Sequence, residues 1–369
     1  MKGKPFKQGR RGQKYMKNLV IDKRIIRENL RVVKSRAEGA TIIADLSANA
    51  SGMGVLEIAR FLRDEGVRDF AVSDINDARV LRNKGFVEER IMMLRSTADP
   101  DELRELIDLG VVCTAGSYDA AVAINGIAEV NHTVAEIQIK VDTGLGRYGF
   151  LPTETDRIAA IFKYMSSLEI TGTFTTFSAS WKSRKQTMEQ LDTFNSVLDK
   201  LIEMKLEPGI AHCCDSAALF RYDFAHMDAV RIDTALTGRI PGKSIQGIGK
   251  VGYIEAGIEE VHWVPKGYRY GAEHPVKTKS PTKIAVLSVG HYHGFGMTRH
   301  ISTMGFFERF LAGSRPLFVR VNGQKAKVLG KVGLLHSLID VTKIDCTVGD
   351  IALMDVDPVN VKGLPIVYR

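Results

Sequence analysis

Short apolar runs alternate with amphipathic segments over the first two-thirds of the chain. The amphipathic segments carry apolar residues at three-and-four spacing, which predicts helices, for example over residues 26–37, 55–66 and 187–205. Eight apolar runs between them are typical of buried strands: TIIADL (41–46), DFAVS (69–73), RIMML (90–94), GVVCT (110–114), EIQIKV (136–141), EITGTF (169–174), GIAHCC (209–214) and MDAVRI (227–232). Eight strands that alternate with helices predict an α/β fold, a closed (β/α)8 TIM barrel.

From about residue 239 the pattern changes to frequent glycines and short β-rich runs, at 282–290, 316–333 and 350–356. The dipeptide Asn322-Gly323 interrupts the second of these runs, and Asn-Gly is a strong signal for a two-residue hairpin turn. An all-β domain therefore follows the barrel. The predicted parts of the chain are a basic flexible arm (1–15), the barrel (16–240) and a C-terminal β domain (241–369).

Composition places the chain among ordinary globular proteins. Its 369 residues, 44% hydrophobic and 25% charged, suffice for one large domain and a smaller one. The four cysteines show no metal-ligand spacing, so we expect a reduced protein in which Cys213 and Cys214 are buried thiols. A signal peptide and an 18-residue apolar run are both missing from the sequence, which favours a cytoplasmic location without membrane insertion.

The positive charge is concentrated at the start of the chain. Seven basic residues precede the first acid, Asp22, and without them the formal net charge of +8 falls to +1. Such an arm could contact nucleic acid. However, it contains only two aromatic residues and no folded basic face accompanies it, so a solvated extension is favoured and nucleic-acid binding is not expected.

Five segments, taken in their order along the chain, carry a resemblance to a known family: KVDTGLGRYGF (140–150), HCCDSAALFRYDFAHMDAVRIDTALTG (212–238), IAVLSVGHYHG (284–294), VLGKVGLLHSLIDVT (328–342) and IVYR (366–369). They resemble the signature segments of bacterial alanine racemases, the fold-type III pyridoxal-phosphate enzymes. The resemblance implies an N-terminal barrel, a C-terminal β domain and a head-to-tail homodimer. It also implies a small-molecule site to which both subunits contribute.

The segment ADLSANASGMG (44–54) departs from this family at its central residue. In the family, the matching lysine forms the Schiff base with pyridoxal phosphate and acts as a catalytic base. Here Ser47 stands at that position, and no lysine lies between Lys34 and Lys84. Since a hydroxyl cannot form an imine, covalent attachment of the cofactor at residue 47 is excluded. Pyridoxal phosphate would be held only non-covalently, and no other cofactor is expected.

The second catalytic base of the family also differs. The tyrosine of its GYADG segment corresponds to His291 in GHYHG. A histidine can act as a general acid or base near neutral pH. The equally weighted alternative is a surface or interface histidine without a catalytic role. Leu335 in GLLHS corresponds to an aspartate at the rim of the family's active site.

The resemblance also assigns a phosphate site. Three of its contacts are matched: Ser216, Thr234 (through its backbone) and Tyr368. A tyrosine of the family has become Ser51, while Asp215 replaces an asparagine and Asp233 a glycine. Two carboxylates repel a phosphate dianion by about 1 kcal/mol each when well solvated. We therefore expect a pocket with a changed preference for ligand charge.

Four basic or polar positions match the family. Arg231 corresponds to the arginine at the pyridine nitrogen, Arg147 to the one near the substrate carboxylate, Lys140 to a lysine that is often carbamylated, and His212 to the histidine that opens the seventh βα loop. A structural role, holding the DTG loop, is favoured for Lys140. For Arg147 and Arg231 a structural and a functional role are equally open.

Asp45 and Ser47 are two residues apart and are expected to point together into the barrel. A carboxylate there requires a partner, so we predict a bond to a basic or hydroxyl group. Acids and histidines of the pocket also offer metal ligands: Asp45, Asp215, Asp233, His212 and His291. Polar residues of a remodelled pocket without a metal are the favoured interpretation.

Three functions follow. The first and favoured one is an alanine-racemase-like protein without ordinary racemase activity that binds a small amino-acid-like or cationic metabolite. The second is an enzyme of altered chemistry, such as an amino-acid isomerase, that uses His291 as acid or base with non-covalent pyridoxal phosphate or a metal. The third is a dimeric scaffold whose basic arm binds nucleic acid or another partner. Membership of an isomerase family thus leaves enzymatic activity uncertain.

Overall fold

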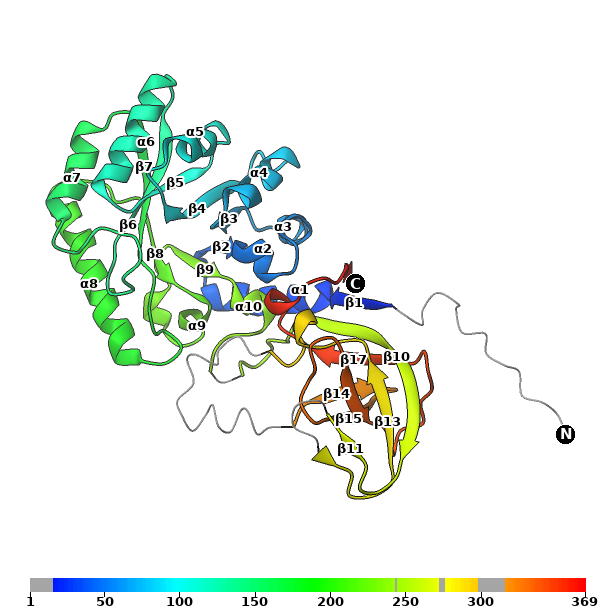
Figure 1. The fold of residues 1–369 in the computed structure, drawn as a ribbon. Coiled ribbons are helices and arrows are strands. Elements are labelled where there is room, and N and C mark those ends of the chain that lie inside the picture. Colours follow the sequence, from blue (N-terminus) through cyan, green and yellow to red (C-terminus); the bar gives the residue numbers. More distant parts are fainter. Residues whose placement is uncertain (1–15, 243, 272–275, 298–315) are drawn as a thin grey trace. The chain divides into compact units, whose positions relative to one another are not determined.

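The computed structural model describes residues 16–242, 244–271, 276–297 and 316–369 (Figure 1). The predicted basic arm over residues 1–15 lies outside this range. The chain divides into two compact units, a barrel unit of residues 24–250 and a β unit that combines residues 1–23 with 251–369.

The barrel unit contains a closed sheet of eight parallel strands in the order β2-β3-β4-β5-β6-β7-β8-β9. The ring closes where Ile43 of β2 pairs with Arg231 of β9. All eight predicted strands are confirmed: β2 (Thr41–Asp45), β3 (Asp69–Val72), β4 (Arg90–Ser96), β5 (Val112–Ala115), β6 (Ala135–Lys140), β7 (Leu168–Phe174), β8 (Ile210–Cys214) and β9 (Ala229–Ile232).

Amphipathic helices connect the strands, and their ends follow local capping chemistry. The side chain of Asp74 accepts the Asn76 N–H before α4, and Asp99 accepts the Glu102 N–H before α5. The three predicted helices are confirmed as α1, α3 and α8. The helices are α1 (Lys23–Ala37), α2 (Ser47–Ser51), α3 (Val55–Asp64), α4 (Ile75–Asn83), α5 (Pro100–Asp108), α6 (Tyr118–Val130), α7 (Thr155–Tyr164), α8 (Arg184–Glu203), α9 (Ser216–Leu219) and α10 (Thr234–Thr237).

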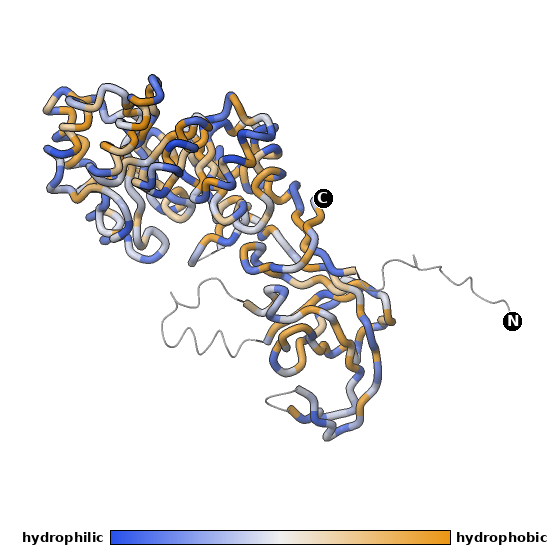
Figure 2. The backbone as a smooth tube through the Cα atoms, turned by 45° about the horizontal axis from the view of Figure 1, so that its top comes forward, coloured by the Kyte–Doolittle hydropathy of each residue, from blue (hydrophilic) through white to orange (hydrophobic). Residues whose placement is uncertain are grey.

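Side chains fill the interior of the barrel. Ile43, Met92, Val112 and Phe174 form one buried cluster with alanines of β3 and β9. The barrel is therefore a packed core, and space for a ligand remains only at an end of the strands. Figure 2 shows how apolar and polar residues alternate along the chain in each unit.

The β unit is built on one eight-stranded sheet, in the order β13-β16-β15-β14-β17-β10-β1-β18. Asn322 and Gly323 form the predicted hairpin turn between β14 and β15, and both have the positive φ angles that such a turn requires. The strands of this sheet are β1 (Lys17–Ile21), β10 (Tyr253–Val264), β13 (Thr282–Leu287), β14 (Phe318–Val321), β15 (Gln324–Leu329), β16 (Ser337–Asp340), β17 (Ile351–Asp355) and β18 (Ile366–Tyr368).

The domain boundary differs from the predicted division into residues 16–240 and 241–369. Strand β1 belongs to the β unit, because it pairs antiparallel with β10 and parallel with β18. A short apolar run gives no local sign of which sheet it will join, since both partners are more than 200 residues away. Within the described part of the chain, no helix has the length and apolar character needed to cross a bilayer.

Candidate functional site

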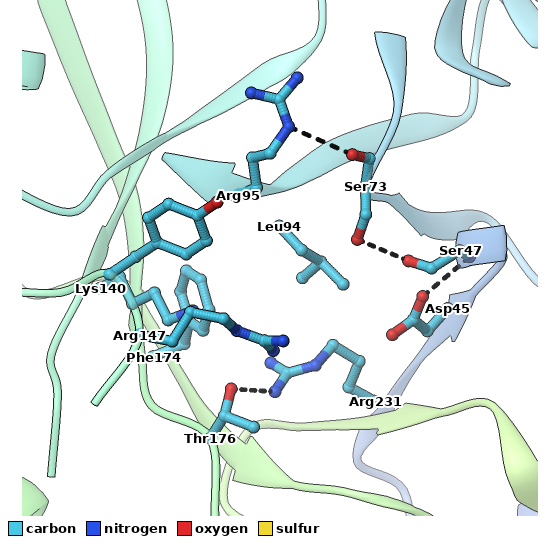
Figure 3. A pocket seen from close by; sticks show the side chains of 11 residues that line it. Asp45, Ser47, Ser73, Leu94, Arg95, Lys140, Arg147, Phe174, Thr176 and Arg231 are labelled. Carbon is cyan, nitrogen blue, oxygen red and sulfur yellow. Dashed lines mark hydrogen bonds between the residues drawn. The ribbon is translucent and has the colours of Figure 1, made fainter. Parts of the chain in front are cut away.

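A pocket of about 350 Å³ opens where the barrel strands end (Figure 3). Asp45, Lys140 and Phe174 are the last residues of β2, β6 and β7, and Ser73 directly follows β3. This is the end of a TIM barrel at which active sites are found. The lining residues are Asp45, Ser47, Ser73, Leu94, Arg95, Lys140, Arg147, Tyr148, Phe174, Thr176 and Arg231.

The loop that carries Ser47 has an unusual backbone. Ala48, Asn49, Ala50 and Ser51 have φ angles of 57°, 56°, 53° and 52°, so four consecutive residues with side chains are left-handed. Each such residue costs roughly 1–2 kcal/mol. The turn is held by the Asn49 side chain, whose Oδ1 accepts the Val55 N–H at 2.8 Å. Ser51, a predicted site residue, is buried in this turn and does not line the pocket.

Asp45 and Ser47 both face the pocket, as predicted (Figure 3). Oδ1 of Asp45 accepts the backbone N–H of Ser47 at 3.0 Å, and the Ser47 hydroxyl pairs with that of Ser73 at 2.7 Å. Burial raises the pKa of Asp45 and the Asp233 carboxylate adds to this, while the hydrogen bonds of Ser47 and the charge of Arg231 oppose it. Ser47 is thus the hydroxyl partner of Asp45, and Arg231 acts on Asp45 through its charge.

Arg231 is fixed by a buried network inside the barrel. Its Nη1 lies 3.1 Å from His212 Nδ1, and its Nη2 donates to the Thr176 hydroxyl at 2.8 Å. Because arginine only donates, His212 Nδ1 must accept, and Nε2 carries the proton that it donates to Gln138 Oε1 at 2.8 Å. Burial and the charge of Arg231 lower the pKa of His212, so the ring is neutral. His212 is thus a positioning residue for Arg231.

Lys140 is buried between two rings. Its Nζ lies 5.4 Å from the ring centroid of Tyr148 and 5.5 Å from that of Phe174. Burial, then Arg231 and Arg147, lowers the pKa of Lys140 to about 8, against the opposing charge of Asp142.

Asp142 holds the DTG loop, because its carboxylate accepts the N–H groups of Gly144, Leu145 and Gly146 at 2.8–3.1 Å. The role of Lys140 in holding this loop stays a prediction, and its amine contacts the ring of Tyr148 in the same segment. Neither Lys140 nor Arg147 donates a hydrogen bond to any residue that the structure describes. Both side chains are therefore available to a ligand.

A second polar group, the carboxylate cluster, lies at the ends of β8 and β9. Ser216 Oγ accepts the N–H groups of Asp233 and Ala235 at 3.0 and 3.1 Å and donates to Asp233 Oδ1 at 3.0 Å. Asp215 caps α9 by accepting the N–H groups of Ala217 and Ala218 at 2.9 and 2.8 Å.

The Asp215 carboxylate also accepts the Ser180 hydroxyl, at 2.6 Å to Oδ2. Burial raises the pKa of Asp215, and the nearby Asp233 adds to the shift. Thr234 is buried at the start of α10, beside this cluster in sequence. The structure thus separates the predicted site residues of the barrel into the pocket and the carboxylate cluster.

The remaining predicted residues lie in the β unit. His291 is exposed at the start of a 3-10 turn, His291–His293, and Leu335 is also exposed. The ring of Tyr368 lies under Lys23 Nζ, 5.6 Å from its centroid. The roles of His291 and Tyr368 in a site with the barrel remain predictions.

The metal alternative receives no support from the geometry. Among the residues with described positions, no three His, Cys, Asp or Glu side chains gather as metal ligands. The prediction for Cys213 and Cys214 is confirmed, since both are buried free thiols, and burial raises the pKa of Cys213 to about 12.

Sequence reasoning missed more than half of the pocket lining. These residues are Ser73, Leu94, Arg95, Tyr148, Phe174 and Thr176. Most of them lie at or just after the carboxyl end of a predicted strand, and that rule alone would have selected them. Arg95 carries no free charge, because its guanidinium is paired with both carboxylate oxygens of Glu102.

Comparisons with known proteins agree with this architecture. The family model "Alanine racemase, N-terminal domain" matches residues 21–241, and "Alanine racemase, C-terminal domain" matches residues 251–360. The chain belongs to the alanine racemase family. The alanine racemase of Clostridium tetani is 30% identical over 336 residues, which cover 87% of this chain and 81% of that protein. That of Desulforamulus reducens is 28% identical over 335 residues, covering 88% and 85%.

Solved alanine racemases share the fold. The enzyme from the D-cycloserine producing Streptomyces lavendulae superposes with a TM-score of 0.84 at 23% identity, over 96% of this chain and 97% of that one. The enzyme from Bartonella henselae, solved with covalently bound pyridoxal phosphate, gives a TM-score of 0.80 at 22% identity, over 96% and 99%. The resemblance to alanine racemases and the predicted barrel with a C-terminal β domain are thus confirmed.

Alanine racemases form a family of pyridoxal-phosphate enzymes, so the fit of that group can be tested on the residues present. Ser47 has no amine for an imine. The Ser216 hydroxyl and the N–H groups around it already bond within the carboxylate cluster, and Asp215 occupies the first N–H groups of α9. A phosphate would have to displace two carboxylates of the chain. The residues of this barrel therefore do not fit pyridoxal phosphate.

Proposed function

We propose that this alanine racemase family member does not racemise amino acids through an imine at residue 47, and instead binds a small metabolite with a carboxylate in the barrel pocket. The observation that carries the proposal is the charge of the lining. Lys140, Arg147 and Arg231 contribute positive charge, while Asp45 is the one carboxylate among the described lining residues. This favours an amino-acid-like ligand over a purely cationic one.

The two arginines are suited to different tasks. Arg231 is held in one orientation by His212 and Thr176, so it offers a fixed positive charge. Arg147 has no bond to a described residue, and its planar guanidinium can bind a carboxylate with two parallel hydrogen bonds. Asp45, on the β2 side of the pocket, is placed for an amino or hydroxyl group of the same ligand.

Two functions expected from the sequence are not part of this proposal. Non-covalent pyridoxal phosphate is not retained, because the carboxylate cluster uses the donors that its phosphate requires. Catalysis by His291 has no structural support beyond the exposure of that side chain. A cytoplasmic, head-to-tail homodimer remains part of the proposal, and the exposed apolar side chains of Tyr292, Leu334 and Leu335 in the β unit are consistent with a covered surface.

Isothermal titration calorimetry with matched ligands tests this function. We expect L-lactate and L-alanine to bind, and ethylamine, which lacks a carboxylate, not to bind. Arg147→Gln should weaken lactate binding about tenfold or more, because one charge-assisted hydrogen-bond pair contributes about 1.5–3 kcal/mol. Lys200→Arg, an exposed position on α8, is the control. Equal binding of lactate by the wild type and Arg147→Gln, or racemisation of alanine by the wild type, would refute the proposal.

A further inference from the structure

Lys140 is a buried amine without the partner that such a group normally has. Its side chain is 4% exposed, and it makes neither a hydrogen bond nor an ion pair with any residue in the described ranges. Buried ammonium groups are normally paired with a carboxylate. The nearest candidate, Asp142, uses its carboxylate oxygens for the N–H groups of its own loop. The Lys140 amine therefore faces the pocket and two aromatic rings.

The surroundings of Lys140 increase the fraction of its amine that is neutral. Burial and the charges of Arg231 and Arg147 lower the pKa of Lys140 to about 8, although Asp142 opposes the shift. At pH 7 the Lys140 amine is then neutral in about a tenth of the protein molecules, whereas an ordinary lysine is neutral in less than a thousandth. A free amine that lines such a pocket is a nucleophile for a carbonyl carbon.

The other groups of the pocket select the carbonyl compound. Arg147 and Arg231 line the same space as Lys140 and attract a carboxylate, and the described lining contains no second amine. A carbonyl next to a carboxylate is a 2-oxo acid. With its carboxylate at the two guanidinium groups, such a molecule presents its carbonyl carbon inside the pocket that Lys140 lines (Figure 3).

We propose that Lys140 forms a reversible imine with the carbonyl carbon of a small 2-oxo acid whose carboxylate is held by Arg147 and Arg231. This inference rests on the proposed function, because the same two arginines bind the carboxylate there. It moves the imine-forming amine from the β2 loop, where Ser47 stands, to the end of β6.

The chemistry balances with solvent water as the proton carrier. The lone pair of the neutral Lys140 nitrogen forms the C–N bond, the carbonyl π pair moves to oxygen, and the oxygen takes the proton that the nitrogen releases. A hydronium ion of the solvent then gives a proton to the hydroxyl, which leaves as water. The nitrogen lone pair forms the C=N bond, and the nitrogen returns its proton to solvent water. The sum is amine plus ketone giving imine plus water.

Reduction and peptide mapping test the imine. Wild type, Lys140→Arg and the control Lys200→Arg are each incubated with pyruvate and sodium cyanoborohydride. The buffer is free of carbonate, so that the Lys140 amine is not carbamylated. The modified lysine is located by mass spectrometry. Hydride transfer to the imine carbon leaves a stable secondary amine. We expect the adduct on Lys140 in wild type and Lys200→Arg, and at least a tenfold smaller yield in Lys140→Arg. Acetone, which lacks the carboxylate, should label at least tenfold less.

Lactate binding separates the two proposals, because lactate has the carboxylate but no carbonyl. An equal midpoint of thermal unfolding for Lys140→Arg and the wild type shows that the variant is folded and that the lost adduct is due to the lost amine. Lactate binding by the wild type without a pyruvate adduct on Lys140, or equal labelling in Lys140→Arg, overturns the imine and leaves the proposed function standing. Failure of both lactate and pyruvate to bind the wild type overturns both.

Discussion

Two aspartates make the ends of β8 and β9 unfavourable for binding an anionic group. Asp215 takes the N–H groups at the start of α9, and Asp233 takes the Ser216 hydroxyl. Each carboxylate therefore occupies donors that would otherwise bind an anion. The pocket has the opposite character, since Lys140, Arg147 and Arg231 attract negative charge. The proposed recognition of a small carboxylate thus depends on these three basic residues.

Removing one of these carboxylates should restore anion binding. In Asp233→Gly, the Ser216 hydroxyl proton, which the Asp233 carboxylate accepts in the wild type, becomes free to be donated to phosphate. We expect Asp233→Gly to bind pyridoxal phosphate at least about tenfold more tightly than the wild type, a gain of about 1.4 kcal/mol, in equilibrium dialysis. Asp345→Gly, at a loop position of the β unit, is the matched control. Equal affinity of wild type and Asp233→Gly would contradict the assignment of the carboxylate cluster.

The low pKa of Lys140 predicts how its reactivity depends on pH. Only the neutral amine is a nucleophile, so the rate of acylation should rise as the pH passes upward through the pKa. We expect a midpoint near pH 8 for Lys140, measured by mass spectrometry after pulses of acetic anhydride. A midpoint near 10.4, the value of a lysine in a model peptide, would show that Lys140 is an ordinary exposed amine.

At the scale of elements, the left-handed turn of α2 sets the position of Ser47. It follows β2 directly, and Asn49 ties it to the first residue of α3. The sequence Ala48-Asn49-Ala50 gives little sign of this conformation, because alanine favours right-handed helices. The turn exists because its surroundings fix it at a cost in backbone energy, which is common in loops that build sites.

The strain in this turn predicts the effect of glycine. At Ala48, which is exposed, glycine removes a left-handed penalty of roughly 1–2 kcal/mol and adds an unfolded-state entropy cost of about 0.5–1 kcal/mol. Ala48→Gly should therefore leave the free energy of unfolding unchanged or raise it by up to about 1 kcal/mol in urea denaturation. Ala123→Gly, in the right-handed helix α6, is the control and should lower it by about 1 kcal/mol. Equal losses in both variants would mean that Ala48 is not left-handed in solution.

The eight barrel strands and the hairpin turn were predictable, because burial on both faces produces continuous apolar runs and a tight turn needs residues such as Asn322 and Gly323. Asp45, Ser47, Lys140, Arg147 and Arg231 were also placed in the pocket correctly. Two features depend on residues far apart in the chain and could not be predicted: the pairing of β1 and the bond between Ser216 and Asp233. Asp142 and Asp215 instead bond to N–H groups shortly after them in sequence, and an aspartate before a glycine-rich loop or a helix start is a local signal for such a role.

In the whole molecule, strand β1 pairs with β18, so segments from near the start and near the end of the chain lie in one sheet. Strand β1 lies between β10 and β18, and the Leu19 N–H donates to the Pro365 carbonyl at 3.0 Å. The barrel unit thus begins only after the chain has contributed a strand to the β unit. The stability of the β unit therefore depends on a segment far from it in sequence.

A proline in β1 should destabilise the β unit selectively. Leu19→Pro removes the donor to Pro365 and should lower the free energy of unfolding of the β unit by about 3 kcal/mol or more. Leu19→Met conserves volume and the N–H, and should cost less than about 1.5 kcal/mol. Hydrogen exchange of β10 amides, compared with β5 amides in the barrel unit, measures the difference. Equal effects of the two variants would show that the backbone pairing of β1 is dispensable.

We propose that the barrel pocket binds a small carboxylate, whereas the carboxylate cluster excludes the phosphate of pyridoxal phosphate. A crystal structure of the protein soaked with both L-lactate and pyridoxal phosphate tests this most directly. We expect a lactate carboxylate within hydrogen-bond distance of Arg147 and Arg231, with Asp233 still bonded to Ser216. A phosphate bonded to the Ser216 hydroxyl, with the Asp233 carboxylate displaced, would contradict it.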